Sequence, residues 1–180
     1  MRKYLRTAAV LAASAVFTPA VARAQTTVAL PNSTQTTTLT ANVSDQARVT
    51  VPAGVTFAVT NVSANTAASD ASVTIDAIVL AAATNQLKIS LQANAASFTP
   101  PVAGATTWAA GDVTWNAATW TNATGASGTL SNAAYNTVST CTADTSTCST
   151  TGLVFTLGAK PTVRRSGSHT IVVTWKFESI

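Results

Sequence analysis

Two stretches of this chain alternate between apolar and polar residues, and this period limits the possible fold more than any other feature. In residues 171–178 every second side chain is apolar: Ile171, Val173, Trp175 and Phe177. In residues 87–92 the same holds for Leu87, Ile89 and Leu91. Successive side chains of a strand point to opposite faces, so this period predicts strands with one buried face.

Further strands are predicted where Thr and Val are frequent between turn residues. Threonine makes up about a fifth of residues 25–180, and β-branched side chains pack well on a pleated surface. The predicted strands cover residues 37–43, 47–51, 55–59, 72–80, 112–116, 128–131 and 153–157. Many short strands at this spacing predict an all-β, single-domain, antiparallel β-sandwich of an immunoglobulin-like, pilin-like or jelly-roll-like kind.

One of these segments also carries a helical signal. Apolar residues recur at helical spacing after two residues that could cap a helix, Ser69 and Asp70. These apolar residues are Ile75, Ile78, Val79 and Ala82. A strand is favoured over residues 72–80, and a helix is the alternative.

The first 24 residues have the three parts of a secretory signal peptide. Arg2, Lys3 and Arg6 precede an apolar stretch over residues 8–20, and small residues stand at a cleavage site between Ala24 and Gln25. The apolar stretch is too short for a membrane span, and no second one follows. We therefore expect a protein exported by the general secretory pathway to the cell surface, with no transmembrane segment in the mature chain.

Removal of the signal would change the charge of the protein. Four of the ten basic residues lie in residues 1–24, which leaves six against six acidic residues. The mature chain is then neutral, and its sequence gives no reason to expect nucleic acid as a partner. Residues 25–40 form a Thr-rich arm that suits an edge strand, a flexible leader, or a donor strand that pairs with another subunit. Residues 41–180 are expected to form the sandwich.

The only two cysteines, Cys141 and Cys148, lie close together in the sequence. In an oxidising compartment such an isolated pair most simply forms one disulfide. Two Cys and the single His169 are too few ligands for a structural zinc site. No metal or other cofactor is therefore expected.

Three tryptophans, Trp108, Trp115 and Trp120, lie within thirteen residues. Exposed indoles are good platforms for the apolar faces of sugar rings, so these residues are a candidate glycan-binding site. The alternative is that they fill the core. The alternation places Val113 on the same face as Trp115, which favours the core.

No arrangement of catalytic residues is visible in the sequence. A Ser-His-Asp hydrolase needs a histidine between a carboxylate and a nucleophile, and the single His169 stands at the start of the last predicted strand without a nucleophile motif. The chain is therefore not expected to be an enzyme.

The C-terminal strand resembles the closing strand of two kinds of bacterial surface β-sandwich. In WxL-type cell-surface domains a glycine turn leads into a strand that ends in Trp-x-Leu, and here Trp175 is followed by Phe177 at the leucine position. Residues 87–98 resemble that family's earlier strand, with Leu87 in place of its Trp. Pilin subunits of chaperone-usher systems, and the related spore-coat U-like group, end in an alternating strand after a glycine, as here after Gly167.

This resemblance implies a cell-surface location and a sandwich fold. The leading hypothesis is an extracellular structural subunit that polymerises into a fibre or pilus by β-strand donation. Its expected partners are copies of itself or other surface subunits. The alternative hypothesis is a monomeric secreted module that binds carbohydrate or cell wall, with a polysaccharide as its partner.

Overall fold

Strands make up almost all the regular structure of this computed structural model, which describes residues 27–31, 33 and 35–180. The predicted signal peptide and its cleavage site between Ala24 and Gln25 lie outside the described residues. The chain divides into two units, residues 1–41 and 42–180. The described part of the first unit contains no helix or strand.

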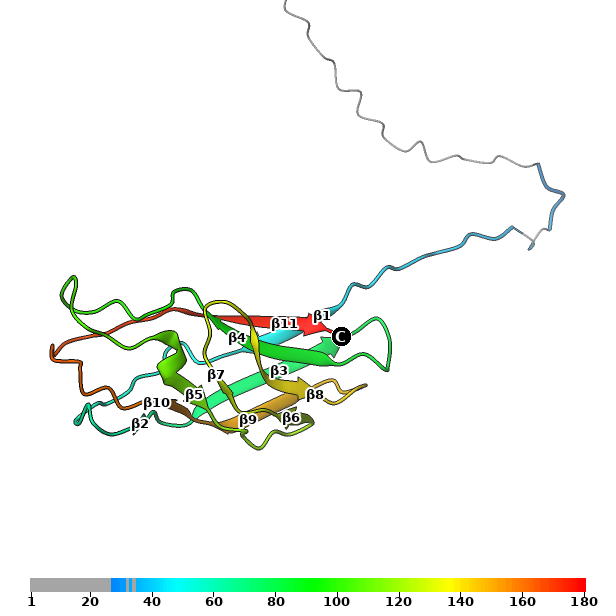
Figure 1. The fold of residues 1–180 in the computed structure, drawn as a ribbon. Helices are drawn as coiled ribbons and strands as arrows, with labels where there is room; N and C mark the ends of the chain where they lie inside the picture. The colour runs from blue at the N-terminus through cyan, green and yellow to red at the C-terminus, as the bar shows by residue number, and fades with distance from the viewer. Residues whose placement is uncertain (1–26, 32, 34) are drawn as a thin grey trace, which may run out of the picture. The chain divides into compact units, whose positions relative to one another are not determined.

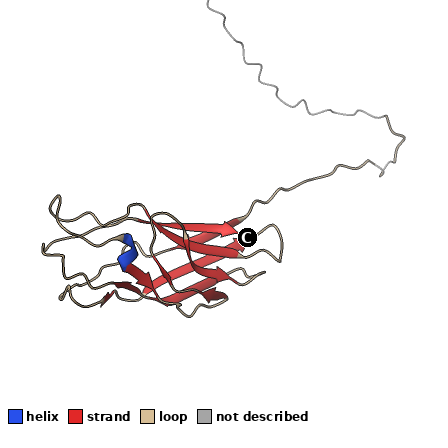
Figure 2. Ribbon diagram, viewed as in Figure 1, coloured by secondary structure: helices blue, strands red, loops and turns tan. Residues whose placement is uncertain are grey.

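The second unit contains eleven strands in three antiparallel sheets, as Figure 1 shows. Sheet A has the order β1 (Gln46–Thr50), β3 (Ala71–Val79), β9 (Cys148–Leu153). Sheet B has the order β2 (Thr66–Ala67), β10 (Phe155–Leu157), β5 (Val113–Trp115), β7 (Gly128–Thr129). Sheet C has the order β11 (Val173–Ser179), β4 (Leu87–Ala93), β8 (Asn136–Cys141), β6 (Ala123–Gly125). One 3-10 helix, η1 (Ala110–Asp112), precedes β5 (Figure 2).

Sheets A and B continue into each other and form one layer of a sandwich. Only Val154 separates β9 from β10, and residues 68–70 separate β2 from β3. Sheet C supplies the other layer, and the core lies between them. Its most buried large side chains are Ile75, Ile89, Leu91 and Leu153. The predicted all-β, antiparallel sandwich fold is confirmed.

The segment with two possible structures is the strand β3, so the helical alternative is wrong. Its side chains alternate between buried and exposed up to Ile75, and the alternation then shifts by one residue. The shift is a β-bulge opposite β1, where Ala77 has a φ of 50°. The bulge brings Ile75 and Ile78 to the same face, which explains their three-residue spacing.

Two predicted strands are absent from the described structure. Residues 37–43 and 55–59 belong to no strand. Phe57 and Val59 still pack against the core. Their alternation therefore reflects side-chain burial, although the backbone of this segment pairs with no strand of the described residues. Leu39 and Val43 are 91% and 71% exposed.

The disulfide between Cys141 and Cys148 is confirmed, and it connects the two layers. Cys141 ends β8 in sheet C, Cys148 begins β9 in sheet A, and their Cα atoms are 5.9 Å apart. Both side chains are buried. Closing so short a loop contributes on the order of 2.5 kcal/mol in the chain-entropy account.

Candidate functional site

The three clustered indoles belong to the core. Trp108, Trp115 and Trp120 are only 4%, 3% and 8% exposed. Trp108 donates its Nε1–H to the carbonyl of Gly158 at 2.9 Å, and Trp115 donates to the carbonyl of Ala126 at 3.0 Å. The candidate glycan platform is therefore wrong for these residues, because a buried ring offers no face to a sugar.

Two glycines make room for these rings. A Cβ atom at Gly128 would collide with the ring of Trp115, and one at Gly125 would lie 2.8 Å from Cδ1 of Trp120. In the sequence both glycines indicate only turns. The pairing of β5 with β7 sets Gly128 opposite Trp115, whereas Gly125 and Trp120 are only five residues apart in the sequence.

A large groove opens the core beside the C-terminal strand. It has a volume of about 930 Å³, and residues 52–62 and 163–175 supply its two walls. Its floor consists of core side chains: Leu91, Phe98, Trp108, Val113, Leu130, Phe155 and Leu157. Partly buried side chains of the walls also pack against the core, among them Phe57, Val59, Val173 and Trp175. The floor side chains are themselves at most 7% exposed, so the apolar surface that an occupant would cover belongs mainly to the partly buried side chains of the walls.

The backbone of β11 has a free edge, and the first part of this strand, Val173 and Trp175, lines the groove. Strand β11 is the last strand of sheet C and pairs on one side with β4. The amide of Asn94 donates to the carbonyl of Val172, and Gln86 and Ile180 exchange both of their backbone hydrogen bonds. In an antiparallel ladder these bonds fall on alternate residues, so the even-numbered residues of β11 bond to β4.

The odd-numbered residues of β11 consequently direct their N–H and C=O groups away from β4. No strand of the described residues pairs with that side. The side chains of Val173, Trp175 and Phe177 are partly buried, while Thr174 and Lys176 are exposed. An incoming strand would thus find both unpaired backbone groups and an apolar surface at the same residues.

A short loop fastens the wall of the groove. The ammonium of Lys160 lies 2.7 Å from Oδ2 of Asp112, and the amide of Lys160 donates to the carbonyl of Val62 at 2.6 Å. Burial by itself would raise the pKa of Asp112. Hydrogen bonds from Lys160 and the Ala109 amide, with the Lys160 charge, outweigh it and lower this pKa. The ion pair therefore fixes Lys160, and the backbone hydrogen bond of Lys160 holds Val62, the end of the wall formed by residues 52–62.

His169 lies at the end of the groove where β11 begins. Its Nδ1 is 2.7 Å from Oγ1 of Thr107, and its Nε2 is 3.1 Å from the carbonyl oxygen of Arg165. Its ring meets that of Trp108 edge to face, with centroids 5.1 Å apart. These contacts are with a hydroxyl, a carbonyl and an indole, and they hold the loop before β11 against the core.

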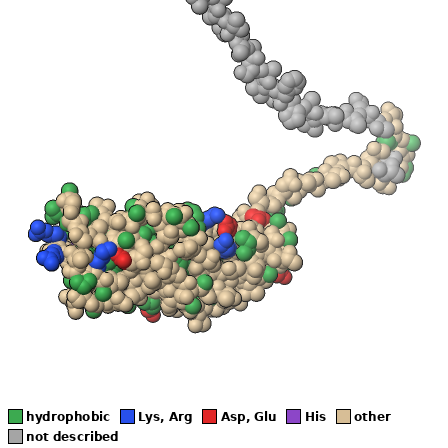
Figure 3. Space-filling model, viewed as in Figure 1, with side chains coloured by type: hydrophobic (Ala, Val, Ile, Leu, Met, Phe, Trp, Pro, Cys, Tyr) green, Lys and Arg blue, Asp and Glu red, His purple; other side chains and the backbone are tan. Residues whose placement is uncertain are grey.

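Most charged side chains of the second unit are paired. The ion pairs join Arg48 to Asp76, Lys160 to Asp112, and both Lys88 and Lys176 to Glu178. Hydrogen bonds from Lys176 and Lys88 lower the pKa of Glu178. Arg164 and Arg165 line the groove and are exposed, and neither forms an ion pair within the described residues. Figure 3 shows Lys and Arg side chains gathered at one end of this unit.

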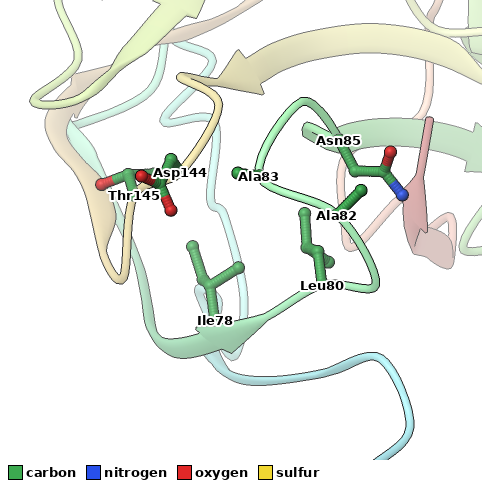
Figure 4. Close-up of a pocket in the computed structure, with 7 residues that line it drawn as sticks. All are labelled: Ile78, Leu80, Ala82, Ala83, Asn85, Asp144 and Thr145. Carbon is green, nitrogen blue, oxygen red and sulfur yellow. The ribbon is translucent and has the colours of Figure 1, made fainter.

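A second, smaller pocket lies between the loop after β3 and the disulfide loop (Figure 4). Its volume is about 110 Å³, and Asp144 is its only charged lining residue. In Figure 4 the amide of Asn85 points away from Asp144, and this amide donates to Oγ of Ser179 at 3.3 Å. Its size and lining suit a few water molecules, so the groove beside β11 is the candidate site.

No group of three or more His, Cys, Asp or Glu side chains in the described part of the chain could hold a metal ion. Among the same residues, no helix has the length and apolar character needed to span a membrane.

No protein-family model matches this chain, and no curated protein or solved structure matches it. The functional interpretation therefore depends on the geometry of the groove and on the sequence.

Proposed function

We propose that this protein is a structural subunit of the bacterial cell surface that polymerises into an extracellular fibre by β-strand donation. The observation that carries this proposal is the groove beside β11, where partly exposed apolar side chains and an unpaired strand edge occur together. An extended peptide that adds to a sheet edge gains main-chain hydrogen bonds and places alternate side chains in pockets.

The chain contains a segment with the pattern that such a donor needs. In residues 37–43, every second side chain is Thr37, Leu39, Ala41 or Val43, and polar side chains stand between them. Leu39 and Val43 are among the most exposed large apolar residues of the described chain. Within the described residues nothing covers these two side chains, whereas a neighbour's groove would bury them.

The apolar alternation of residues 37–43 also matches the alternation of free backbone groups along β11. In a hydrogen-bonded antiparallel pair, directly opposed residues place their side chains on the same face. An incoming residue that bonds to Val173 or Trp175 would therefore point its own side chain into the groove. Placing Leu39, Ala41 and Val43 at such positions would bury all three, and each large side chain contributes about 1.5–3 kcal/mol on full burial.

The sequence adds two further supports. The predicted signal peptide and the disulfide suit an exported protein, and the resemblance of the last strand to pilin subunits agrees with an assembly role. The alternative of a monomeric carbohydrate-binding module loses its candidate residues, because the three indoles of the cluster are buried.

Electron microscopy of the purified mature chain, residues 25–180, tests the proposal. We expect negative-stain images to show filaments whose amount increases with protein concentration, because each subunit carries one donor segment and one groove. Single particles at all concentrations, with a monomeric mass by sedimentation, would contradict the proposal.

A further inference from the structure

The two arginines at the end of the groove have no partner in their own subunit. Among the described residues the ion pairs use every Lys and Arg side chain except Arg164 and Arg165. These two residues are adjacent, exposed, and part of the groove wall that leads into β11. Two neighbouring positive charges beside an open groove favour an occupant that brings a negative charge to the same place.

Three acidic residues are equally without a partner in the described structure: Asp45, Asp70 and Asp144. Only Asp45 lies next to the proposed donor segment, residues 37–43. Asp45 follows Val43 by two residues, and it therefore continues the alternation of Leu39, Ala41 and Val43. When these apolar residues enter a groove, Asp45 comes next on the same face.

We infer that Asp45 of one subunit pairs with Arg164 and Arg165 of the next, and that this contact sets the direction of the inserted strand. The inference rests on the proposed function. If the donor runs antiparallel to β11, its C-terminal end lies where β11 begins, and that is the end with the arginines. A parallel donor would carry Asp45 to the opposite end of β11, near Glu178.

The same contact would also fix the position of one subunit's sandwich relative to that of its neighbour. Asp45 stands directly before Gln46, the first residue of β1. A donor whose Asp45 reaches the arginines therefore brings its own sandwich against the neighbour at this end of the groove. Charge pairs at the rim of an interface mainly set association rate and orientation, so the contact acts on the speed and direction of assembly.

A charge exchange tests the inference. The variants are Asp45→Arg, the double variant Arg164→Asp with Arg165→Asp, and all three changes together. We expect Asp45→Arg to slow filament growth about tenfold at low salt, because it opposes like charges at an interface. The double variant should slow growth similarly, the combined variant should recover most of the rate, and high salt should reduce all differences.

Asp70→Arg is the matched control, since it makes the same charge change at an exposed acid outside the groove. Circular dichroism and thermal unfolding check that each variant folds. Growth of Asp45→Arg at the wild-type rate, or no recovery in the combined variant, would overturn the inference while strand donation still stands. Failure of the wild-type chain to form filaments would instead reject the proposed function.

Discussion

The variant that combines Leu39→Asp with Val43→Asp is expected to form no filaments at concentrations where the wild-type chain polymerises. Each substitution would place a carboxylate in the apolar groove of the neighbour, and burying an unpaired charge costs several kcal/mol. We expect the affinity between subunits to fall by a factor of about a thousand or more, since 1.4 kcal/mol corresponds to a factor of ten. Sedimentation and electron microscopy at matched concentrations measure this loss.

The matched control combines Thr38→Asp with Thr40→Asp. It introduces the same charge in the same segment, but on the face that would point away from the groove. We expect this control to assemble nearly as the wild type does. Both variants should fold normally, because Leu39 and Val43 are exposed and lie outside the core. Equal polymerisation of the two variants would show that the alternation of residues 37–43 has no role in assembly.

The second large effect is expected when the donor is moved within one chain. A variant without residues 25–43, in which a two-residue Asp-Gly loop replaces Ile180 and joins Ser179 to a copy of residues 37–43, can fold the copy back along β11 as a hairpin. The copied Thr37 then opposes Ser179, so the copied Leu39 and Val43 oppose Phe177 and Val173. The linker makes insertion intramolecular, and this strongly favours it over binding between chains. We expect this protein to stay monomeric. Its free energy of unfolding in guanidinium should exceed that of the variant without any copy by about 3 kcal/mol or more, because the copy covers the apolar walls of the groove.

Its control carries aspartate at the two copied positions that correspond to Leu39 and Val43. This control keeps the length and the loop but lacks the apolar side chains, so its stability should match that of the variant without any copy. Guanidinium unfolding followed by tryptophan fluorescence compares the three proteins. If the intact copy adds no stability over its control, the groove does not accept this segment.

The sequence predicts the strands that carry large apolar residues at every second position. Both β4 and β11 are visible in this way, because β4 buries one face along its whole length and β11 has one partly buried face. Strands β8 and β9 are not, since their runs Asn-Thr-Val-Ser-Thr-Cys and Cys-Ser-Thr-Thr-Gly-Leu contain few large apolar residues. These two segments are strands through their ladders with β4 and β3, which depend on contacts distant in sequence.

The groove illustrates a second limit of sequence analysis. The strand predicted over residues 55–59 is absent, although Phe57 and Val59, two of its alternating apolar residues, are partly buried against the core. The sequence pattern cannot reveal that the backbone of this segment pairs with no strand of the described structure. In the same way, the alternation in residues 37–43 predicts a strand but cannot identify its partner, and the free edge that we propose for it belongs to β11, far away in the chain.

The position of the indoles was open in the sequence for a similar reason. The shared face of Val113 and Trp115 favours the core, and the structure buries both residues. The space for the ring of Trp115, however, comes from Gly128 on the neighbouring strand β7. That closeness exists only once β5 and β7 have paired.

Hydrogen exchange of the β11 amides tests most directly the claim that a neighbour's arm pairs with this strand. The outward N–H groups of Val173, Trp175 and Phe177 have no strand partner within the described residues of one subunit. In filaments, quenched exchange read by NMR should show these three amides strongly protected, and in the monomer without residues 25–43 they should exchange rapidly. Filaments in which these amides exchange as fast as in that monomer would contradict strand donation to β11.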